Sequence, residues 1–199
     1  MNKELYESKT MTNLVRAFAG ESQASARYKI LADEAKKQGL CQLSEFMKMV
    51  STNEYYHAKT IYGFIESACD KPIDGMKVCA NYPFKEKSNT FVENFRLAAF
   101  DENEEATEIY PSFARIAHDE GFKEIGTFFD NLVQVETCHN KALTEIYNEL
   151  KNDTMYNRTP AIKWKCAHCG HEATLEHAWK KCPICNSPQG DIMLELEEN

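Results

Sequence analysis

The segments Glu54-Tyr-Tyr-His57 and Glu136-Thr-Cys-His139 decide the fold. Each lies in a stretch whose apolar residues recur at spacings of three and four, residues 43–68 and 125–150. Such spacing predicts amphipathic helices with one buried face. In both segments the glutamate and the histidine fall on that apolar face, one helical turn apart. Each helix is therefore expected to carry a carboxylate and an imidazole into the core.

The same periodicity predicts four long helices, at residues 6–37, 40–68, 88–119 and 122–150. Gly39 and Gly121 occupy positions expected for C-terminal helix caps, so each marks a tight reversal between antiparallel helices. Residues 69–87 contain two prolines and a glycine and lack the helical period, which predicts a long connection. Two hairpins joined by one crossover are the connectivity of the ferritin-like four-helix bundle. We therefore expect a mainly α bundle over residues 1–150.

The two predicted hairpins repeat each other. An offset of 82 residues relates Tyr28 to Tyr110, Gly39 to Gly121, Glu54 to Glu136, and His57 to His139. The period is too long, and the copies are too few, for a solenoid. A duplicated helical hairpin explains the pattern.

Five acidic residues and two histidines occupy stripe positions that should be apolar: Glu21, Glu54, His57, Glu102, Glu105, Glu136 and His139. Buried carboxylates are costly unless they are paired or bind a metal, and the stripes contain no Lys or Arg. All seven lie 15 to 19 residues from Gly39 or Gly121, which places them at one level of the bundle. Ferritin-like di-metal proteins use a Glu from each of two helices and Glu-x-x-His from the other two. The pattern predicts a di-metal centre with one additional carboxylate.

A single Glu-x-x-His on a helix is usually exposed to solvent and proves little. Two such motifs at matching heights in a repeated hairpin favour the metal centre. Five further acidic residues are expected to belong to the ordinary charged surface: Asp101, Glu104, Glu108, Glu120 and Glu124.

Tyr28 and Tyr110 face the same stripes. They are either core aromatic residues or hydrogen-bond partners of ligating carboxylates. Glu21 precedes Tyr28 by seven residues, whereas Glu102 precedes Tyr110 by eight. One additional residue in a repeated helix predicts a π-bulge near residues 102–110, with Pro111 loosening the same turn.

The cysteines fall into two groups. Four form two Cys-x-x-Cys pairs separated by twelve residues, Cys166, Cys169, Cys182 and Cys185, and this spacing predicts a tetrahedral all-sulfur metal site. The spacing leaves zinc and iron open. We expect a linker at 151–162 and a small second domain at 163–199, whose metal also holds its fold. The other group, to which no role is assigned, comprises Cys41, Cys69, Cys79 and Cys138.

Composition excludes several classes of function. The chain has 199 residues and a formal net charge of −8, which disfavours nucleic acid binding. Its N-terminus is polar, and no run approaches the ~18 apolar residues of a membrane span. A cytoplasmic protein is expected.

The motifs resemble those of the rubrerythrin family, over nearly the whole chain. Those that carry the resemblance are Gly20-Glu-Ser-Gln-Ala-Ser-Ala-Arg-Tyr28, Glu54-Tyr-Tyr-His57, Glu102-Asn-Glu-Glu105 with Tyr110-Pro-Ser-Phe-Ala-Arg, Glu136-Thr-Cys-His139, and the paired cysteines followed by Pro188-Gln189. The resemblance implies a ferritin-like di-iron domain followed by a rubredoxin-like domain with one iron.

The resemblance also implies roles for the individual residues. Glu54 and Glu136 would bridge or share the two irons. Glu21 and His139 would be terminal ligands on opposite irons, with Glu102 terminal on the second. Glu105 and His57 would alternate on the first iron with its oxidation state. The four paired cysteines would hold rubredoxin-like iron, which favours iron over zinc.

The activity implied by the resemblance is that of a non-haem di-iron peroxidase reducing hydrogen peroxide to water. Its electrons would come through the rubredoxin-like iron from an external donor, such as a rubredoxin or an NAD(P)H-rubredoxin reductase. The chain itself has no Rossmann fingerprint. About 16 Å of helix separates His139 from Leu150, so the donor iron is expected in another subunit of a head-to-tail homodimer or higher oligomer.

Two alternatives remain on sequence grounds. A ferroxidase or iron-storage protein would share the bundle but would leave the cysteine domain without a role. A metal-binding or sensor module would carry zinc between the cysteine pairs.

Overall fold

The computed structural model describes residues 3–68, 75–79, 90–194 and 196. Its helices are α1 (Lys3–Tyr6), α2 (Lys9–Lys37), α3 (Cys41–Ser67), α4 (Phe91–Glu104), the π-helix η1 (Glu105–Ile109), α5 (Tyr110–Asp119) and α6 (Lys123–Asn152). A small C-terminal part contains β1 (Asn157–Lys165), β2 (Glu172–His177) and the 3-10 helix η2 (Gln189–Asp191). The mainly α fold class is confirmed.

The first expected helix, at 6–37, begins three residues later than predicted, at Lys9. The Ser8 side chain accepts a hydrogen bond from the backbone N–H of Met11 and caps the start of α2. Residues before Ser8 form the short helix α1 instead of continuing α2. The third expected helix begins at Phe91, after the cap Thr90, and its first residues, 88 and 89, lie outside the described residues.

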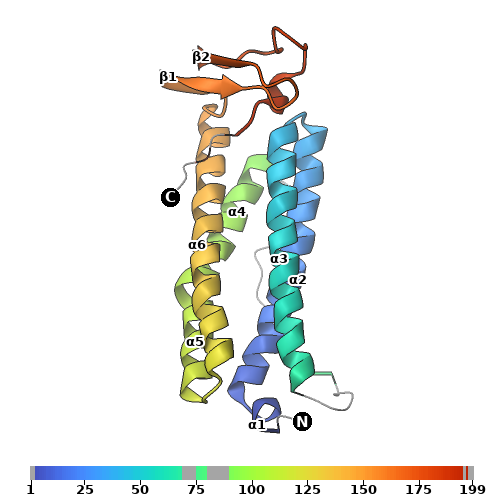
Figure 1. The fold of residues 1–199 in the computed structure, drawn as a ribbon, viewed down its shortest axis with the longest axis vertical. Helices are drawn as coiled ribbons and strands as arrows, with labels where there is room; N and C mark the ends of the chain where they lie inside the picture. Colours follow the sequence, from blue (N-terminus) through green and yellow to red (C-terminus); the bar gives the residue numbers. More distant parts are fainter. Residues whose placement is uncertain (1–2, 69–74, 80–89, 195, 197–199) are drawn as a thin grey trace.

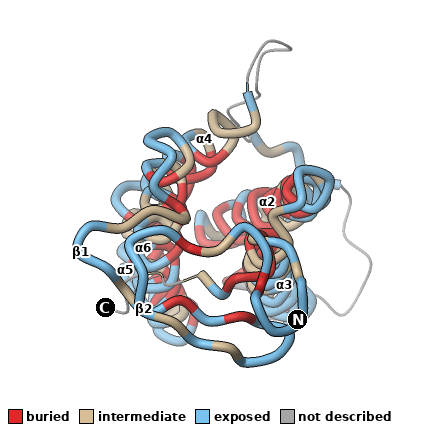
Figure 2. The backbone as a smooth tube through the Cα atoms, turned by 90° about the horizontal axis from the view of Figure 1, so that it is seen from above, coloured by how far each residue is buried: buried red, intermediate tan, exposed pale blue. Residues whose placement is uncertain are grey.

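The two expected reversals have the left-handed backbone that favours glycine, with φ of 78° at Gly39 and 88° at Gly121. They pair α2 with α3, and α5 with α6, as antiparallel neighbours (Figure 1). The α3 helix ends at the opposite end of the bundle from the start of α4, as the single crossover requires. In Figure 2 the buried segments of the helices face one another across the bundle.

The apolar core is divided into two clusters. One contains Leu14, Ile61 and Phe129 and lies toward the Gly121 end. The other contains Met47, Phe95, Leu143 and further residues toward the Gly39 end. Along each hairpin the predicted ligands lie between the residues that supply one cluster and those that supply the other. The polar level therefore lies midway along the bundle.

The predicted π-bulge is confirmed. Residues 105–109 form one turn of π-helix between α4 and α5, and this accommodates the additional residue in the second hairpin. Because of this turn, Glu102 and Tyr110 both remain buried although they are eight residues apart.

The C-terminal part rests on the end of the bundle where α2 turns into α3 (Figure 1). Its strands β1 and β2 pair antiparallel, with an irregular register between Asn157 and Ile162. The expected linker at 151–162 has regular structure: it contains the end of α6, a turn and the first part of β1. In the described part of the chain, no helix has the length and apolarity needed to span a membrane.

Gly190 permits a close approach between the two parts. A Cβ atom at this position would overlap the carbonyl oxygen of Gly39. We expect Gly190→Ala to destabilise the protein by about 1–3 kcal/mol, because a methyl group must displace backbone. Hydrogen exchange at Cys41, whose amide lies at this contact, should accelerate.

Gly63→Ala is the matched control. A Cβ atom at Gly63 meets nothing within 4 Å, and the position is helical, so alanine should stabilise the protein by about 0.5–1 kcal/mol. Equal effects of the two substitutions on denaturant unfolding would contradict the proposed close contact.

Candidate metal centre

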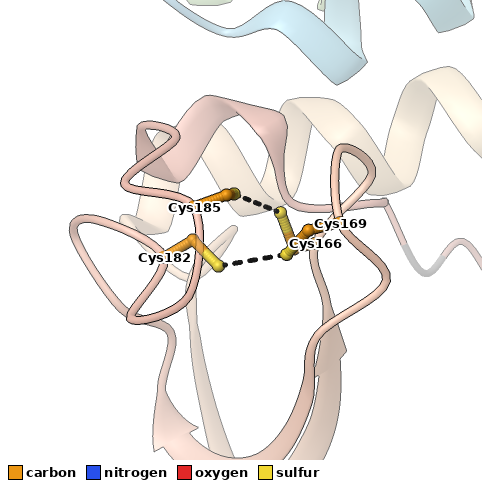
Figure 3. Close-up of side chains that lie close together, drawn as sticks. All are labelled: Cys166, Cys169, Cys182 and Cys185. Atoms are coloured by element: carbon orange, nitrogen blue, oxygen red, sulfur yellow. Dashed lines mark hydrogen bonds between the residues drawn. The ribbon is translucent and has the colours of Figure 1, made fainter.

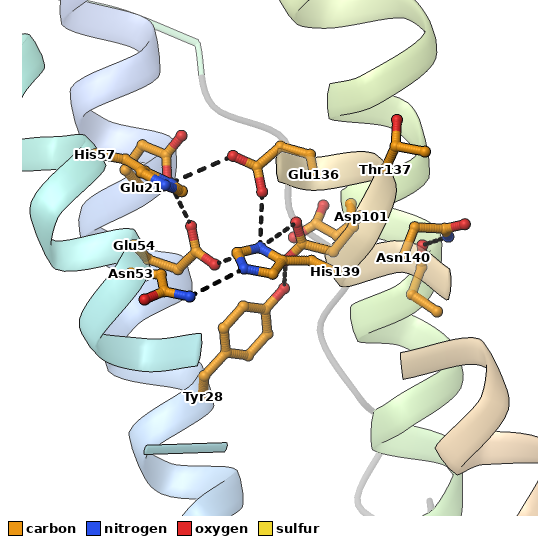
Figure 4. Close-up of polar contacts among 12 residues, drawn as sticks. Glu21, Tyr28, Asn53, Glu54, His57, Asp101, Glu136, Thr137, His139 and Asn140 are labelled. Carbon is orange, nitrogen blue, oxygen red and sulfur yellow. Dashed lines mark hydrogen bonds and ion pairs between the residues drawn. The ribbon is translucent and has the colours of Figure 1, made fainter. Parts of the chain in front are cut away.

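Six of the seven predicted bundle ligands converge in the core (Figure 4). They form two sets that share Glu54 and Glu136: one is completed by Glu21 and His57, the other by Glu102 and His139. Within each set the candidate ligand atoms lie within 4.8 Å of one another. We call the first set site 1 and the second set site 2. Two cations could therefore lie side by side with two shared carboxylates.

The carboxylate oxygens fit a pair of cations. Among the described residues, one buried oxygen of each of four glutamates lacks a hydrogen bond of good geometry: Glu21 Oε2, Glu54 Oε1, Glu102 Oε2 and Glu136 Oε1. Each lies 3.0 to 3.6 Å from the Nδ1 atom of a histidine. Oxygens and imidazole nitrogens turned toward common points are the donor set of carboxylate-rich metal sites. This arrangement satisfies the buried charges only when cations are bound between them.

The electrostatics show how strongly the groups interact. Burial raises the pKa of Glu21 to about 8. Burial opposes ionisation of Glu54, yet hydrogen bonds from His139 and His57 lower its pKa to about 2. Burial would lower the pKa of His57, but hydrogen bonds with Glu21 and Glu54 raise it to about 10, and the pKa of His139 is raised likewise by Glu102 and Glu136. The protonation of each group in the cluster therefore depends strongly on its neighbours.

The two repeated tyrosines are hydrogen-bond donors to the ligands. Tyr28 Oη donates to Glu102 and Tyr110 Oη donates to Glu21, so each tyrosine reaches a carboxylate on the other hairpin. Burial, followed by neighbouring carboxylates, raises the pKa of both phenols well above 10. Each phenol therefore keeps its proton and fixes one oxygen of a glutamate that belongs to a single ligand set.

The expectation that Asp101 belongs to the charged surface is wrong. Asp101 is buried and pairs with Arg27, which lies over the ring of Tyr28. The pair stands beside Glu102, because Arg27 precedes Tyr28 and Asp101 precedes Glu102 in the chain. Sequence analysis also missed Asn53, whose side-chain Nδ2 lies 3.3 Å from Nε2 of His139 (Figure 4). The broken repeat was the available signal: the repeat partner of Asn53 is Val135.

Glu105 lies outside both ligand sets. It begins the π-helix, and its Oε1 atom is 3.6 Å from the place of a Cβ on Gly20. Burial, followed by the charges of Glu21 and Glu102, raises its pKa well above 4.5. In this structure it is His57 that belongs to site 1, whereas Glu105 lines an adjacent cavity.

The four paired cysteines form a second cluster (Figure 3). The Sγ atoms of Cys166 and Cys185 are 3.7 Å apart and those of Cys169 and Cys182 are 3.6 Å apart. Metal–sulfur bonds of about 2.3 Å in a tetrahedron give sulfur separations of about 3.8 Å, whereas a disulfide requires about 2 Å. Burial opposes ionisation of Cys166, but a hydrogen bond from Ser187, a residue that sequence analysis did not identify, lowers its pKa to about 6. The geometry fits one tetrahedral metal ion.

A crossover bundle with two linked carboxylate–histidine sets defines the class of ferritin-like di-metal proteins. The Rubrerythrin family model matches residues 12–147. The chain belongs to the rubrerythrin family.

Curated relatives extend the match beyond the bundle. A rubrerythrin of Porphyromonas gingivalis is 38% identical over 95% of this chain and 91% of its own length. A rubrerythrin of Nitratidesulfovibrio vulgaris is 36% identical, over 96% and 97%. Among solved structures, a mixed-valence nigerythrin covers 95% of this chain and 90% of its own, with a TM-score of 0.61 at 24% identity. A bacterioferritin of Desulfovibrio desulfuricans covers 76% and 85%, with a TM-score of 0.64 at 19% identity. Those two structures show the fold alone.

Metal binding should release protons from the bundle. Glu21 and His57 hold protons at neutral pH because their pKa values are raised to about 8 and about 10, whereas a ligating carboxylate or imidazole must be deprotonated. Metal affinity should therefore rise with pH through about pH 8, where Glu21 loses its proton, and on to about pH 10, where His57 does. Anaerobic calorimetric titration of metal-free protein with ferrous iron, in buffers of different ionisation enthalpy, measures the released protons.

Glu21→Gln is the control, because an amide holds no proton to release. It should release fewer protons per metal bound. A proton count of zero for the unsubstituted protein would contradict the assignment of these groups as ligands.

Proposed function

We propose that this protein is a non-haem di-iron peroxidase that reduces hydrogen peroxide to water in defence against oxidative stress. Two irons would occupy sites 1 and 2, and one iron would occupy the four-cysteine cluster. The observation that supports this proposal is the pair of carboxylate-sharing ligand sets in the same chain as a four-thiolate cluster. Membership of the rubrerythrin family supports the same choice of metal.

Reduction of one hydrogen peroxide consumes two electrons and two protons and yields two water molecules. Two ferrous ions bound side by side would supply both electrons and polarise the peroxide oxygens. Tyr28 and Tyr110 hold Glu102 and Glu21 in fixed orientations on opposite sides of the centre. The apolar clusters on both sides exclude water, which strengthens every charge interaction at the centre.

Glu105 is suited to carry a proton. Its carboxyl group lies beside the centre without belonging to either ligand set, and burial raises its pKa well above 4.5, which favours the protonated carboxyl. Ile109 and Tyr110 flank it along the adjacent cavity. Glu105 can therefore deliver a proton toward site 1.

The alternative function of a ferroxidase uses the same bundle. The four-cysteine cluster favours the peroxidase, because a single-electron iron centre serves to reload a reduced site. Its outer thiols are accessible: Cys169 and Cys185 are exposed, and the neighbouring Ile184 is 68% exposed. An external donor, a rubredoxin or an NAD(P)H-rubredoxin reductase, would contact this surface in the cytoplasm.

The electron relay is proposed to run between subunits of a head-to-tail homodimer or higher homo-oligomer. The cysteine part contacts its own bundle at Gly39, 18 residues from Glu21 along α2, or about 27 Å. Direct electron transfer over that distance is slow. Tyr55 and Tyr56 are 54% and 56% exposed on α3 beside His57. Large exposed aromatic side chains next to the centre support contact with the cysteine part of a second copy.

Anaerobic mixing of the reduced, iron-loaded protein with one equivalent of hydrogen peroxide tests the proposed activity. Both bundle irons should be oxidised with two waters formed, and this reaction should be faster than oxidation by dioxygen. Glu136→Ala, which removes a shared carboxylate, should abolish it while the absorbance of the four-thiolate iron persists. A protein that oxidises iron with dioxygen but not with peroxide would be a ferroxidase.

Complementation tests the relay between subunits. Glu136→Ala chains lack the bundle centre and Cys182→Ser chains lack the thiolate centre, so each alone should be inactive with an external reductase. Mixed oligomers, formed by joint refolding, should recover turnover. In them the thiolate centre of a Glu136→Ala chain can face the bundle centre of a Cys182→Ser chain, which gives one intact donor and acceptor. Turnover that stays absent in verified mixed oligomers would place the relay within one chain or eliminate it.

A further inference from the structure

The two halves of the repeat differ beside the terminal glutamates. Aligning Glu21 with Glu102 places Gly20 opposite Asp101, and aligning Tyr28 with Tyr110 places Arg27 opposite Ile109. The ligands themselves are repeated, so the two sites differ in what surrounds them.

Beside site 2, the two aligned positions hold Arg27 and Asp101, which form an ion pair. Arg27 pairs with Asp101, and its guanidinium group lies 5.6 Å from the ring centre of Tyr28. Tyr28 in turn donates to Glu102. The two charged side chains occupy the space between the helices that carry them.

Beside site 1, the equivalent position is open. Gly20 has no side chain, and a cavity of about 210 Å³ lies against Gly20, Ile109 and Tyr110. The inner end of this cavity is lined by Glu105, close to Gly20, and by Tyr110, which donates a hydrogen bond to the ligand Glu21. A solute in the cavity therefore reaches site 1 by passing these two side chains. Its outer end is lined by the exposed residues Cys79 and Glu108.

We propose that this cavity is the access route by which small neutral hydroperoxides reach site 1. The occupant is identified by charge and size. Asp101, which pairs with Arg27, and Glu105, whose raised pKa favours the neutral carboxyl, line the cavity without adding net charge. The remaining charged residues of the lining are Glu104 and Glu108 against one arginine, Arg16. Hydrogen peroxide is neutral at physiological pH and small, so the acidic lining admits it while repelling anions. The identity of the solute rests on the proposed peroxidase function, whereas the route itself rests on the cavity and the broken repeat.

Two plugging substitutions at the outer end test the route. Cys79→Trp and Glu108→Trp place an indole ring in the cavity without replacing a bundle ligand. Glu124→Trp is the matched control, because Glu124 is exposed on α6 and does not line the cavity. Iron content per chain and melting temperature verify that each variant keeps its centre.

Nitric oxide is the first probe, because it is a small neutral molecule that binds ferrous iron without peroxidase turnover. Stopped-flow association of nitric oxide with the reduced bundle centre should slow roughly tenfold in each plugged variant. Oxidation by hydrogen peroxide should slow by a similar factor. The Glu124→Trp control should match the unsubstituted protein in both reactions.

Nitric oxide association tests the access route, and oxidation by hydrogen peroxide tests the proposed peroxidase function, so the two proposals can fail separately. Slower nitric oxide association in a protein that does not reduce peroxide would support the route and overturn the peroxidase proposal. Unchanged nitric oxide association in both plugged variants that retain iron would overturn the route, even if peroxide is reduced. Equal slowing by Glu124→Trp would also overturn it, because the effect would then not depend on the cavity.

Discussion

The structure depends on the burial of carboxylates between two apolar clusters. Glu21, Glu54, Glu102 and Glu136 are at most 1% exposed, and an ionised carboxylate in such surroundings is strongly destabilising unless opposite charge lies against it. Two histidines cannot balance four glutamates while also being neutral ligands. Two cations between the carboxylates would balance their charge. The stability of the fold and the formation of the metal centre therefore depend on each other.

The duplicated hairpin supplies the ligands of both sites by repeating one pattern. Each hairpin carries one terminal glutamate on its first helix and one Glu-x-x-His on its second, so antiparallel packing brings equivalent groups together from both sides. The tyrosine of each hairpin crosses to a glutamate of the other. The π-helix at Glu105–Ile109 is the exception, because it adds one carboxylate to the second hairpin without displacing Tyr110 from its repeated role.

Much of this arrangement could be predicted from the sequence, because height along a helix follows from counting residues. Counting from Gly39 and Gly121 placed the ligands at one level, and the spacing of seven against eight located the π-helix. Contacts between helices depend on rotation and rotamer, which counting does not fix. The sequence therefore suggests a surface position for Asp101, although Asp101 is buried and pairs with Arg27.

The surroundings of the repeated ligands are more polar at site 2 than at site 1. Site 2 has the Arg27–Asp101 pair beside Glu102 and Asn53 beside His139. The repeat partners of these groups at site 1 are smaller or apolar: Ile109, Gly20 and Val135. Polar contacts to a ligand restrict its orientation, so His139, which lies beside Asn53, is held more firmly than His57. A centre with one fixed and one less restrained position can keep its metals while one side adapts to an incoming ligand. The cavity lies on that less restrained side.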